Sequence, residues 1–286
     1  DPKTFNLSVV ALKTKLEQAE QAGKLPKVVI PVHLCGLPCD MEAIGELANQ
    51  YGFFVIEDAS HAIGGQYQNE AIGSCRYSDI TVFSFHPVKT ITTGEGGAAL
   101  TNKYELAEKM ALLRSHGITR EPQSMTHEPD GDWYYQQVDL GYNYRMTDIQ
   151  AALGLSQMTR LDEFVDRRHK IAARYDDLLN DLPVTSQHRT SGYYSGMHLY
   201  VIRIATEKLD KSHEQIFSEL REAGIGVNLH YIPVHTQPWF QAMGFKVGDY
   251  PQAEQYYAQA ISLPMFPGLS ETEVVTVVDA LRKNMA

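Results

Sequence analysis

The chain has 286 residues, of which 43% are hydrophobic and 21% charged, and its formal net charge is -10. This length suits one large domain or two unequal ones, and the composition is that of a globular enzyme or binding protein. The negative charge argues against a general nucleic-acid binder, because neutralising phosphates requires a basic surface. No run of eighteen apolar residues is present, so we expect no membrane span, and the first residues lack the pattern of a signal peptide.

The three cysteines, Cys35, Cys39 and Cys75, form no CxxC pair and are odd in number. We therefore expect reduced thiols, as in a cytoplasmic protein, and no metal site.

The first half alternates between strand and helix patterns. A helix is predicted over 39–52, with Asp40 as its N-cap and Gly52 as its stop. Apolar, β-branched runs predict strands that are buried on both faces, as in a parallel sheet. These strands cover 27–34, 53–60 and 79–85, and a fourth strand is predicted at 96–102. Strands and helices at this spacing predict a mostly parallel sheet with crossover helices.

Further along, a helix is predicted over 103–117 and a polar loop over 119–135. Residues 143–181 read as one long amphipathic helix or two joined ones, and Thr147 with Gln150 forms a capping box. The pattern then changes to a smaller α+β unit. Its predicted strands are 198–205 and 227–233, and its predicted helices are 212–224 and 272–284.

Three polar residues fall where parallel strands end, which is where open sheets bind ligands. Asp58 ends "FFVIED", Ser84 ends "DITVFS", and Lys89 follows five residues later. A desolvated lysine is a nucleophilic amine that can bind pyridoxal phosphate (PLP) covalently. Asp58 could then hold the ring nitrogen and Ser84 the phosphate. The residues alone equally allow a surface lysine on a loop and an aspartate in a turn, and "GEGG" is no P-loop.

Several longer stretches strengthen the first interpretation. "EDASHAIGGQY", "SFHPVKTITTGEGGAALTN", "LRSHGI", "GYNYRMTDIQAALGLSQ" and "HYIPVH" together closely resemble the DegT/DnrJ/EryC1/StrS family of PLP-dependent sugar aminotransferases. "SFHPVK" and "ALGLSQ" are most like its transaminases of pseudaminic-acid biosynthesis. The resemblance implies a fold-type I α/β transferase, with a large PLP-binding domain over 1–160 and a small α+β domain over 161–286.

The resemblance also implies roles for single residues. Lys89 would bind PLP covalently, Asp58 would pair with its ring nitrogen, and Ser84 would bind its phosphate. His61 would lie against the cofactor, although it could instead be a satisfied loop histidine. Asn143 would reach the phosphate of the neighbouring subunit, which predicts a homodimer with shared active sites.

Substrates follow from the same resemblance. Asn228, His230 and Tyr231 would contact a nucleotide-sugar, although a strand face with His and Tyr is as often core or interface. The expected reaction moves the amino group of glutamate to a 4-keto-6-deoxy nucleotide-sugar, for amino sugars of cell-surface glycans. Family members that dehydrate carry a histidine at the lysine position, so Lys89 favours transamination.

One departure from the family leaves two hypotheses. Relatives have a substantial portion before the stretch matching "DPKTFNLSVV", and that portion supplies part of the phosphate site. The chain is expected either to represent most of an active sugar aminotransferase or to be an inactive family member. The latter would fold, dimerise and bind nucleotide-sugar without turnover.

Overall fold

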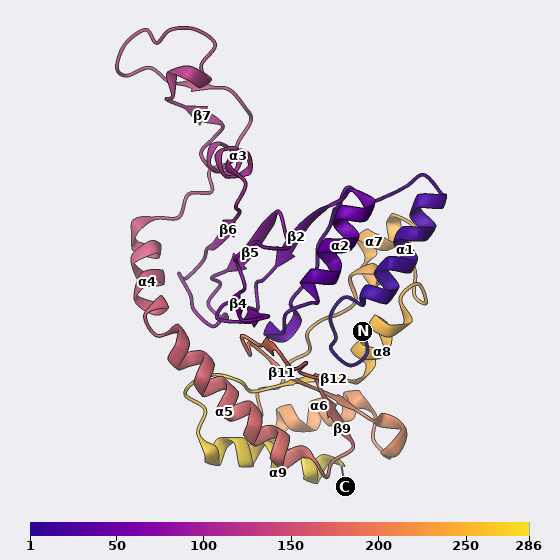
Figure 1. Ribbon diagram of the computed structural model, residues 1–286. Helices are drawn as coiled ribbons and strands as arrows, with labels where there is room; N and C mark the ends of the chain where they lie inside the picture. The colour runs from indigo at the N-terminus through magenta and orange to yellow at the C-terminus, as the bar shows by residue number, and fades with distance from the viewer. Residues whose placement is uncertain (286) are drawn as a thin grey trace.

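The computed structural model describes residues 1–285, which form two groups of elements around separate hydrophobic cores (Figure 1). The helices are α1 (Val9–Gln21), α2 (Met41–Tyr51), α3 (Tyr104–Arg114), α4 (Asp148–Met158), α5 (Leu161–Leu179), α6 (His213–Glu222), α7 (Pro238–Ala242), α8 (Pro251–Gln259) and α9 (Glu271–Met285). The strands are β1 (Val28–Val29), β2 (Phe54–Asp58), β3 (Gln66–Tyr67), β4 (Glu70–Ala71), β5 (Ile80–Ser84), β6 (Gly97–Leu100), β7 (Ile118–Thr119), β8 (Gln136–Gln137), β9 (Val184–Ser186), β10 (Tyr193–Tyr194), β11 (Tyr200–Ile204) and β12 (Ala260–Leu263).

The sheet of the first group has the strand order β1-β2-β5-β6. Strands β1, β2 and β5 are parallel, and β6 runs antiparallel to β5. The register places Asp58 of β2 opposite Val82 of β5. The prediction of a mostly parallel sheet is therefore confirmed, and the ends of β2 and β5 lie at one edge.

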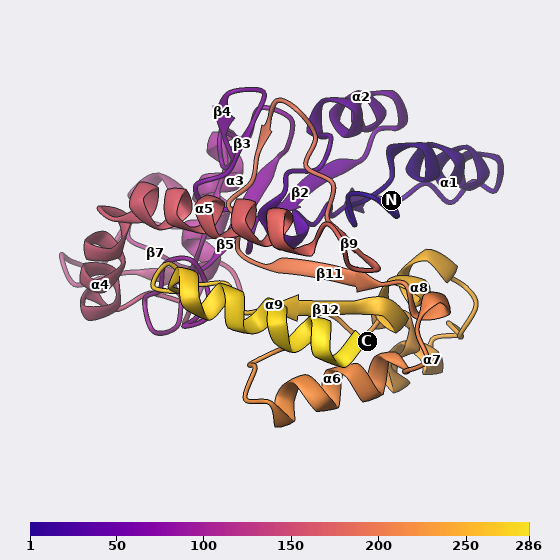
Figure 2. The ribbon, with the colours of Figure 1, turned by 90° about the horizontal axis from the view of Figure 1, so that it is seen from below.

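Helix α2 connects β1 to β2 and covers one face of this sheet. Asp40 caps it by accepting a hydrogen bond from the Ala43 backbone N–H, and Gly52 ends it in the left-handed conformation at φ 74°. Ile44 is fully buried against Val55 of β2 in the same core. Helix α1, which the sequence analysis did not predict, packs beside α2 (Figure 2).

The prediction that these strands are buried on both faces is wrong. Val28, Ile30 and Phe54 are 41%, 57% and 58% exposed, whereas Val55 is 1% exposed. Side chains alternate along a strand, so residues on one face pack under α2 while their neighbours point out of the opposite face. Strand β1 is also much shorter than the predicted 27–34.

The predicted strand at 227–233 is likewise wrong. Only Asn228 pairs, through a single bridge to Ser262. The carbonyl oxygen of His230 instead accepts a hydrogen bond from the Tyr256 hydroxyl at 2.8 Å, and Pro233 has no N–H to donate to a neighbouring strand.

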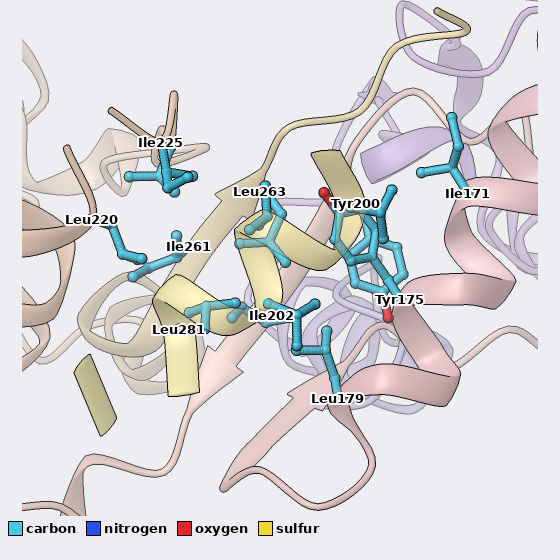
Figure 3. Packing of buried hydrophobic residues seen from close by; sticks show 14 of the residues in the cluster. Ile171, Tyr175, Leu179, Tyr200, Ile202, Leu220, Ile225, Ile261, Leu263 and Leu281 are labelled. Carbon is cyan, nitrogen blue, oxygen red and sulfur yellow. The ribbon is translucent and has the colours of Figure 1, made fainter. Parts of the chain in front are cut away.

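The second group of elements is an antiparallel sheet in the order β12-β11-β9 with helices around it. Figure 2 shows α5, α6 and α9 beside β11 and β12. Their apolar faces meet in one large core, in which Tyr175, Ile202 and Leu281 are fully buried (Figure 3). This supports an α+β unit, whereas the division at 160/161 stays a prediction.

The segment 143–181 forms two helices, α4 and α5, and the capping box of Thr147 and Gln150 is confirmed at the start of α4. The predicted helix at 103–117 is α3, which buries no residue and projects from the body together with β7 (Figure 1). Residues 119–135 form the expected loop around a short 3-10 turn, Pro122–Ser124. No helix within residues 1–285 is long and apolar enough to cross a membrane.

Candidate active site

Asp58 and Ser84 are the last residues of β2 and β5, as the sequence predicted. The backbone of Asp58 is fixed on both sides, because its N–H donates to Pro31 O at 2.9 Å and its carbonyl accepts from the His33 N–H at 3.1 Å. One carboxylate oxygen, Oδ1, accepts from the Ser60 N–H at 3.0 Å. Oδ2 has no hydrogen-bond partner within residues 1–285, so Asp58 is positioned but still has an oxygen to offer.

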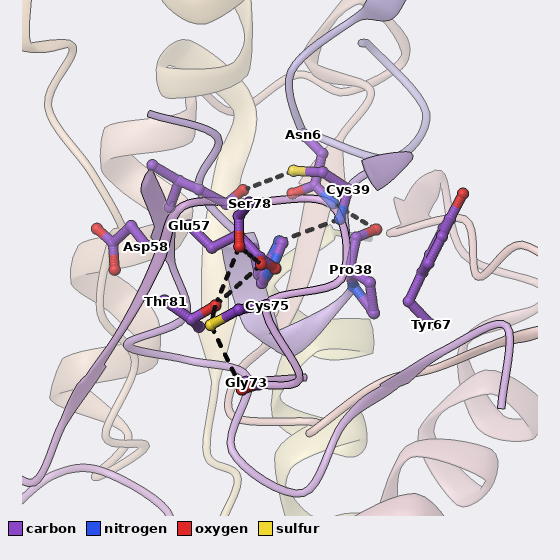
Figure 4. Close-up of polar contacts among 12 residues, drawn as sticks. Asn6, Pro38, Cys39, Glu57, Asp58, Tyr67, Gly73, Cys75, Ser78 and Thr81 are labelled. Atoms are coloured by element: carbon purple, nitrogen blue, oxygen red, sulfur yellow. Dashed lines mark hydrogen bonds and ion pairs between the residues drawn. The ribbon is translucent and has the colours of Figure 1, made fainter. Parts of the chain in front are cut away.

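Glu57, next to Asp58, belongs to a different cluster that the sequence analysis missed. Its carboxylate accepts hydrogen bonds from Ser78 Oγ and from Thr81 Oγ1, and it pairs with His33 Nε2 at 2.8 Å. Burial opposes ionisation, but these hydrogen bonds prevail and lower the pKa of Glu57. Figure 4 shows the Asp58 side chain pointing away from this cluster. The sequence signal for this cluster was an acidic residue, Glu57, within an otherwise apolar run.

Lys89 lies half-buried in the loop between β5 and β6. The loop is tied down, since Lys89 N–H donates to His86 O and Thr93 N–H to Phe85 O. Burial lowers the pKa of Lys89, while the Asp58 carboxylate opposes that shift. No ion pair joins Lys89 to Asp58 in the described part of the chain, so the amine stays available for chemistry.

His61 is buried beside these two groups, with 6% of its surface exposed. Burial, followed by the charge of Lys89, lowers its pKa to about 3. Its Nδ1 atom is buried without a hydrogen-bond partner among residues 1–285. Its ring lies 4.5 Å from that of His198 and 6.4 Å from that of Tyr231, between ring centroids. Nδ1 of His61 is thus unsatisfied within the described residues, and its role beside the cofactor stays a prediction.

Two of the three predicted substrate residues come close to this group. His230 exchanges a hydrogen bond with Ser262 Oγ through Nδ1 at 2.7 Å, and burial together with the Lys89 charge lowers its pKa. Tyr231 is 54% exposed as a whole, but partial desolvation of its hydroxyl, followed by the nearby Asp58 carboxylate, raises its pKa. Asn228 is exposed, and its side chain accepts a hydrogen bond from the Leu229 N–H.

Asn143 does not join this group within the chain. It is exposed and pairs with Ser115, the residue that follows α3. Its predicted role in a neighbouring subunit's site stays a prediction. His198 was missed, because nothing in "HLYVIRIA" marks its first residue as more than a strand end.

A cavity of about 860 Å³ adjoins the lysine. Lys89, Thr90, Phe164, Arg168 and Phe266 are among the residues that line it. Its lining includes neither Asp58 nor His61, so this cavity adjoins Lys89 on another side than these two groups.

Taken together, these residues fit PLP. They offer an amine of lowered pKa, a carboxylate with a free oxygen, and a neutral imidazole whose Nδ1 lacks a partner. Such a combination can hold a carbonyl cofactor and move protons beside it.

The sequence matches the DegT/DnrJ/EryC1/StrS aminotransferase family over residues 1–282. The chain belongs to this family. DegT/DnrJ/EryC1/StrS aminotransferases are PLP-dependent sugar aminotransferases of fold-type I, and the resemblance seen in the sequence is thereby confirmed.

Relatives span several organisms. SpsC of Bacillus subtilis, a spore coat polysaccharide biosynthesis protein, is 38% identical over 286 residues, covering 99% of this chain and 71% of that protein. The uncharacterized protein MJ1066 of Methanocaldococcus jannaschii is 37% identical over 289 residues, covering 99% of this chain and 72% of that protein. This chain is therefore shorter than both.

Solved structures of family members are similar to this chain. PseC of Helicobacter pylori, an aminotransferase involved in the biosynthesis of pseudoaminic acid, has a TM-score of 0.87 at 30% identity, covering 98% of this chain and 71% of its own. Spr1654 of Streptococcus pneumoniae, solved in PLP and PMP forms, has TM-scores of 0.84 and 0.85 at 30% identity. These two matches cover 100% of this chain and 73% and 74% of Spr1654.

Proposed function

We propose that this protein transfers the amino group of glutamate to the 4-keto group of a nucleotide-activated 6-deoxy sugar. The observation that carries the proposal is the half-buried amine of Lys89, which lies near the Asp58 carboxylate at the end of β2 and near the buried, neutral ring of His61. The involvement of PseC in the biosynthesis of pseudoaminic acid supports an amino-sugar product.

Lys89 has two tasks in this proposal. It anchors PLP through Nζ, and its free amine then takes the α-proton of the amino donor and returns it during transfer. When bound, PLP supplies the electron sink that makes this proton removable. Because the pKa of Lys89 is lowered, more of the amine is unprotonated near neutral pH, as a general base requires.

The other residues orient the partners. Asp58 holds a proton at the ring nitrogen of the cofactor, and Ser84 together with Asn143 of a second subunit binds its phosphate. His61 lies against the ring. Asn228, His230 and Tyr231 face the sugar nucleotide.

The proposal includes a homodimer with shared active sites that works in the cytoplasm. The three cysteines are free and buried, as suits a reducing compartment.

Borohydride trapping tests the proposal. Protein saturated with PLP should absorb in the visible range, and reduction should remove that band and add the mass of the reduced cofactor at Lys89. Lys89→Arg keeps the positive charge but lacks the nucleophilic amine, so it should neither trap PLP nor transfer amino groups.

Two results would count against the proposal. A protein that never traps PLP at Lys89 would be the inactive family member instead. A protein that traps PLP but leaves every 4-keto-6-deoxy nucleotide-sugar unchanged in the presence of glutamate would have a different substrate.

A further inference from the structure

His198 reaches the Lys89 site from the second group of elements. It lies just before β11, in a segment that passes between two loops of the first group. Gly196 N–H donates to Gly36 O, and His198 N–H donates to Cys35 O, both at 2.9 Å. This crossing brings an imidazole to the site that is far from Lys89 in the sequence.

Glycine makes the crossing possible. A Cβ atom on Gly36 would lie 2.7 Å from Met197 N and 2.8 Å from His61 O, and one on Gly196 would lie 2.8 Å from Ile63 O. Real Cβ atoms do not approach backbone so closely. The segment that carries His198 is therefore pressed against the backbone of Ala62 and Ile63, the two residues that follow His61.

Arg168 of α5 holds this segment in place through hydrogen bonds to its backbone. Its Nη1 donates to the carbonyl oxygens of Met197, His198 and Met265 at 3.3, 3.0 and 3.0 Å. Arg168 is 4% exposed, so its buried guanidinium joins the segment before β11 to the segment after β12.

The two imidazoles are buried against each other. Their ring centroids are 4.5 Å apart with a tilt of 43°, and His61 and His198 are 6% and 5% exposed. The Nδ1 atom of each is buried without a partner within residues 1–285. A buried polar atom without a partner is destabilising, so an apolar ring would suit this place better if packing were the sole requirement.

We propose that His198 is a positioning residue of the Lys89 site, whose imidazole holds the ring of His61 in the orientation that meets the bound cofactor. This inference rests on the proposed function, because it assumes that His61 contacts PLP. Burial, with the neighbouring His61, Lys89, Arg168 and His230, lowers the pKa of His198 well below its ordinary value. Both imidazoles are then neutral near pH 7, which avoids repulsion between them.

His198→Ala tests the inference, because it removes the ring that packs against His61. In this variant the Kd for PLP, measured by absorbance titration, should rise ~10-fold, and the visible circular dichroism of the bound cofactor should change. His198→Phe keeps a ring in this place, so it should keep the wild-type affinity and should have an unchanged or higher Tm, since no unpartnered nitrogen remains at position 198. A purely structural role of His198 would alter stability without these two effects.

His213→Phe is the matched control. His213 also lies beside an aromatic ring, that of Phe217 at 6.3 Å between centroids, but its Nε2 bonds with Ala260 O at 2.8 Å. Its replacement should lower the Tm and leave the affinity for PLP unchanged. If His198→Ala does not fold, His198→Gln removes the ring and keeps more of the side-chain volume.

NMR separates the inference from the proposed function. The imidazole signals of His61 in cofactor-free protein, assigned with His61→Gln, should shift or broaden in His198→Ala. Unchanged His61 signals, or wild-type affinity and circular dichroism in His198→Ala, would overturn the inference. If wild-type protein binds no PLP at Lys89, the proposed function fails, and the His61 signals still decide whether His198 holds His61.

Discussion

His61 shows how burial at a single residue makes stability depend on pH. An unfolded histidine binds a proton near pH 6.5, whereas folded His61 does so only near pH 3, because burial and then Lys89 lower its pKa. Between these values the unfolded state binds more protons, so stability falls as the pH falls.

The size of this effect can be measured by comparison with His61→Gln. At pH 5 the proton that His61 binds in the unfolded state alone is expected to reduce the free energy of unfolding by about 2 kcal/mol, since each pKa unit corresponds to ~1.4 kcal/mol. Urea unfolding at pH 7.5 and pH 5 should show a loss in the wild type that exceeds the loss in His61→Gln by this amount. Equal losses in the two proteins would contradict the lowered pKa of His61.

At the scale of elements, the decisive contact is the crossing of the 195–198 segment with the loop after β2. Gly196→Ala would place a methyl group against Ile63 O, at a point where backbone meets backbone and cannot yield cheaply. We expect it to lower the free energy of unfolding by about 1–3 kcal/mol, as overpacking does, and to weaken PLP binding as well.

Gly226→Ala is the control for this prediction. A Cβ atom there meets nothing within 4 Å, and Gly226 has no positive φ. Its replacement should leave the stability and the affinity for PLP unchanged. Equal effects of the two substitutions in urea unfolding would show that the crossing is not tightly packed.

At the scale of the whole molecule, exposed apolar side chains gather on the part that carries Asn143. Leu140, Ile149 and Leu155 are 85%, 84% and 72% exposed, as expected of a surface that a second subunit covers. In the proposed dimer, Asn143 of one subunit completes the site that contains Lys89 of the other.

Mixing two inactive variants tests this arrangement. Lys89→Ala and Asn143→Ala should each lose most activity, but co-refolded at equal amounts they should regain activity in about a quarter of the sites. Half of the dimers would then be hybrids, each with one site that keeps both residues. No recovery, although hybrid dimers form, would mean that Asn143 does not act in the partner's site.

Much of this protein followed from short stretches of sequence. The N-cap Asp40, the stop at Gly52 and the capping box at Thr147 depend on neighbours within one helical turn, and all three are confirmed. Asp58 and Ser84 were placed at strand ends by the same local logic. Short stretches of sequence that resemble the family pointed to Lys89, and the family match supports that resemblance.

Tertiary structure decided the remaining features of the fold and the site, because these features depend on contacts between residues that are distant in the chain. The first sheet is buried on one face alone, and residues 227–233 do not form the predicted strand. Both outcomes follow from what packs against those segments. The meeting of His198 with His61 follows from a backbone crossing that no local pattern encodes. Periodicity specifies which residues form an element, whereas the free energy of packing selects which elements share a site.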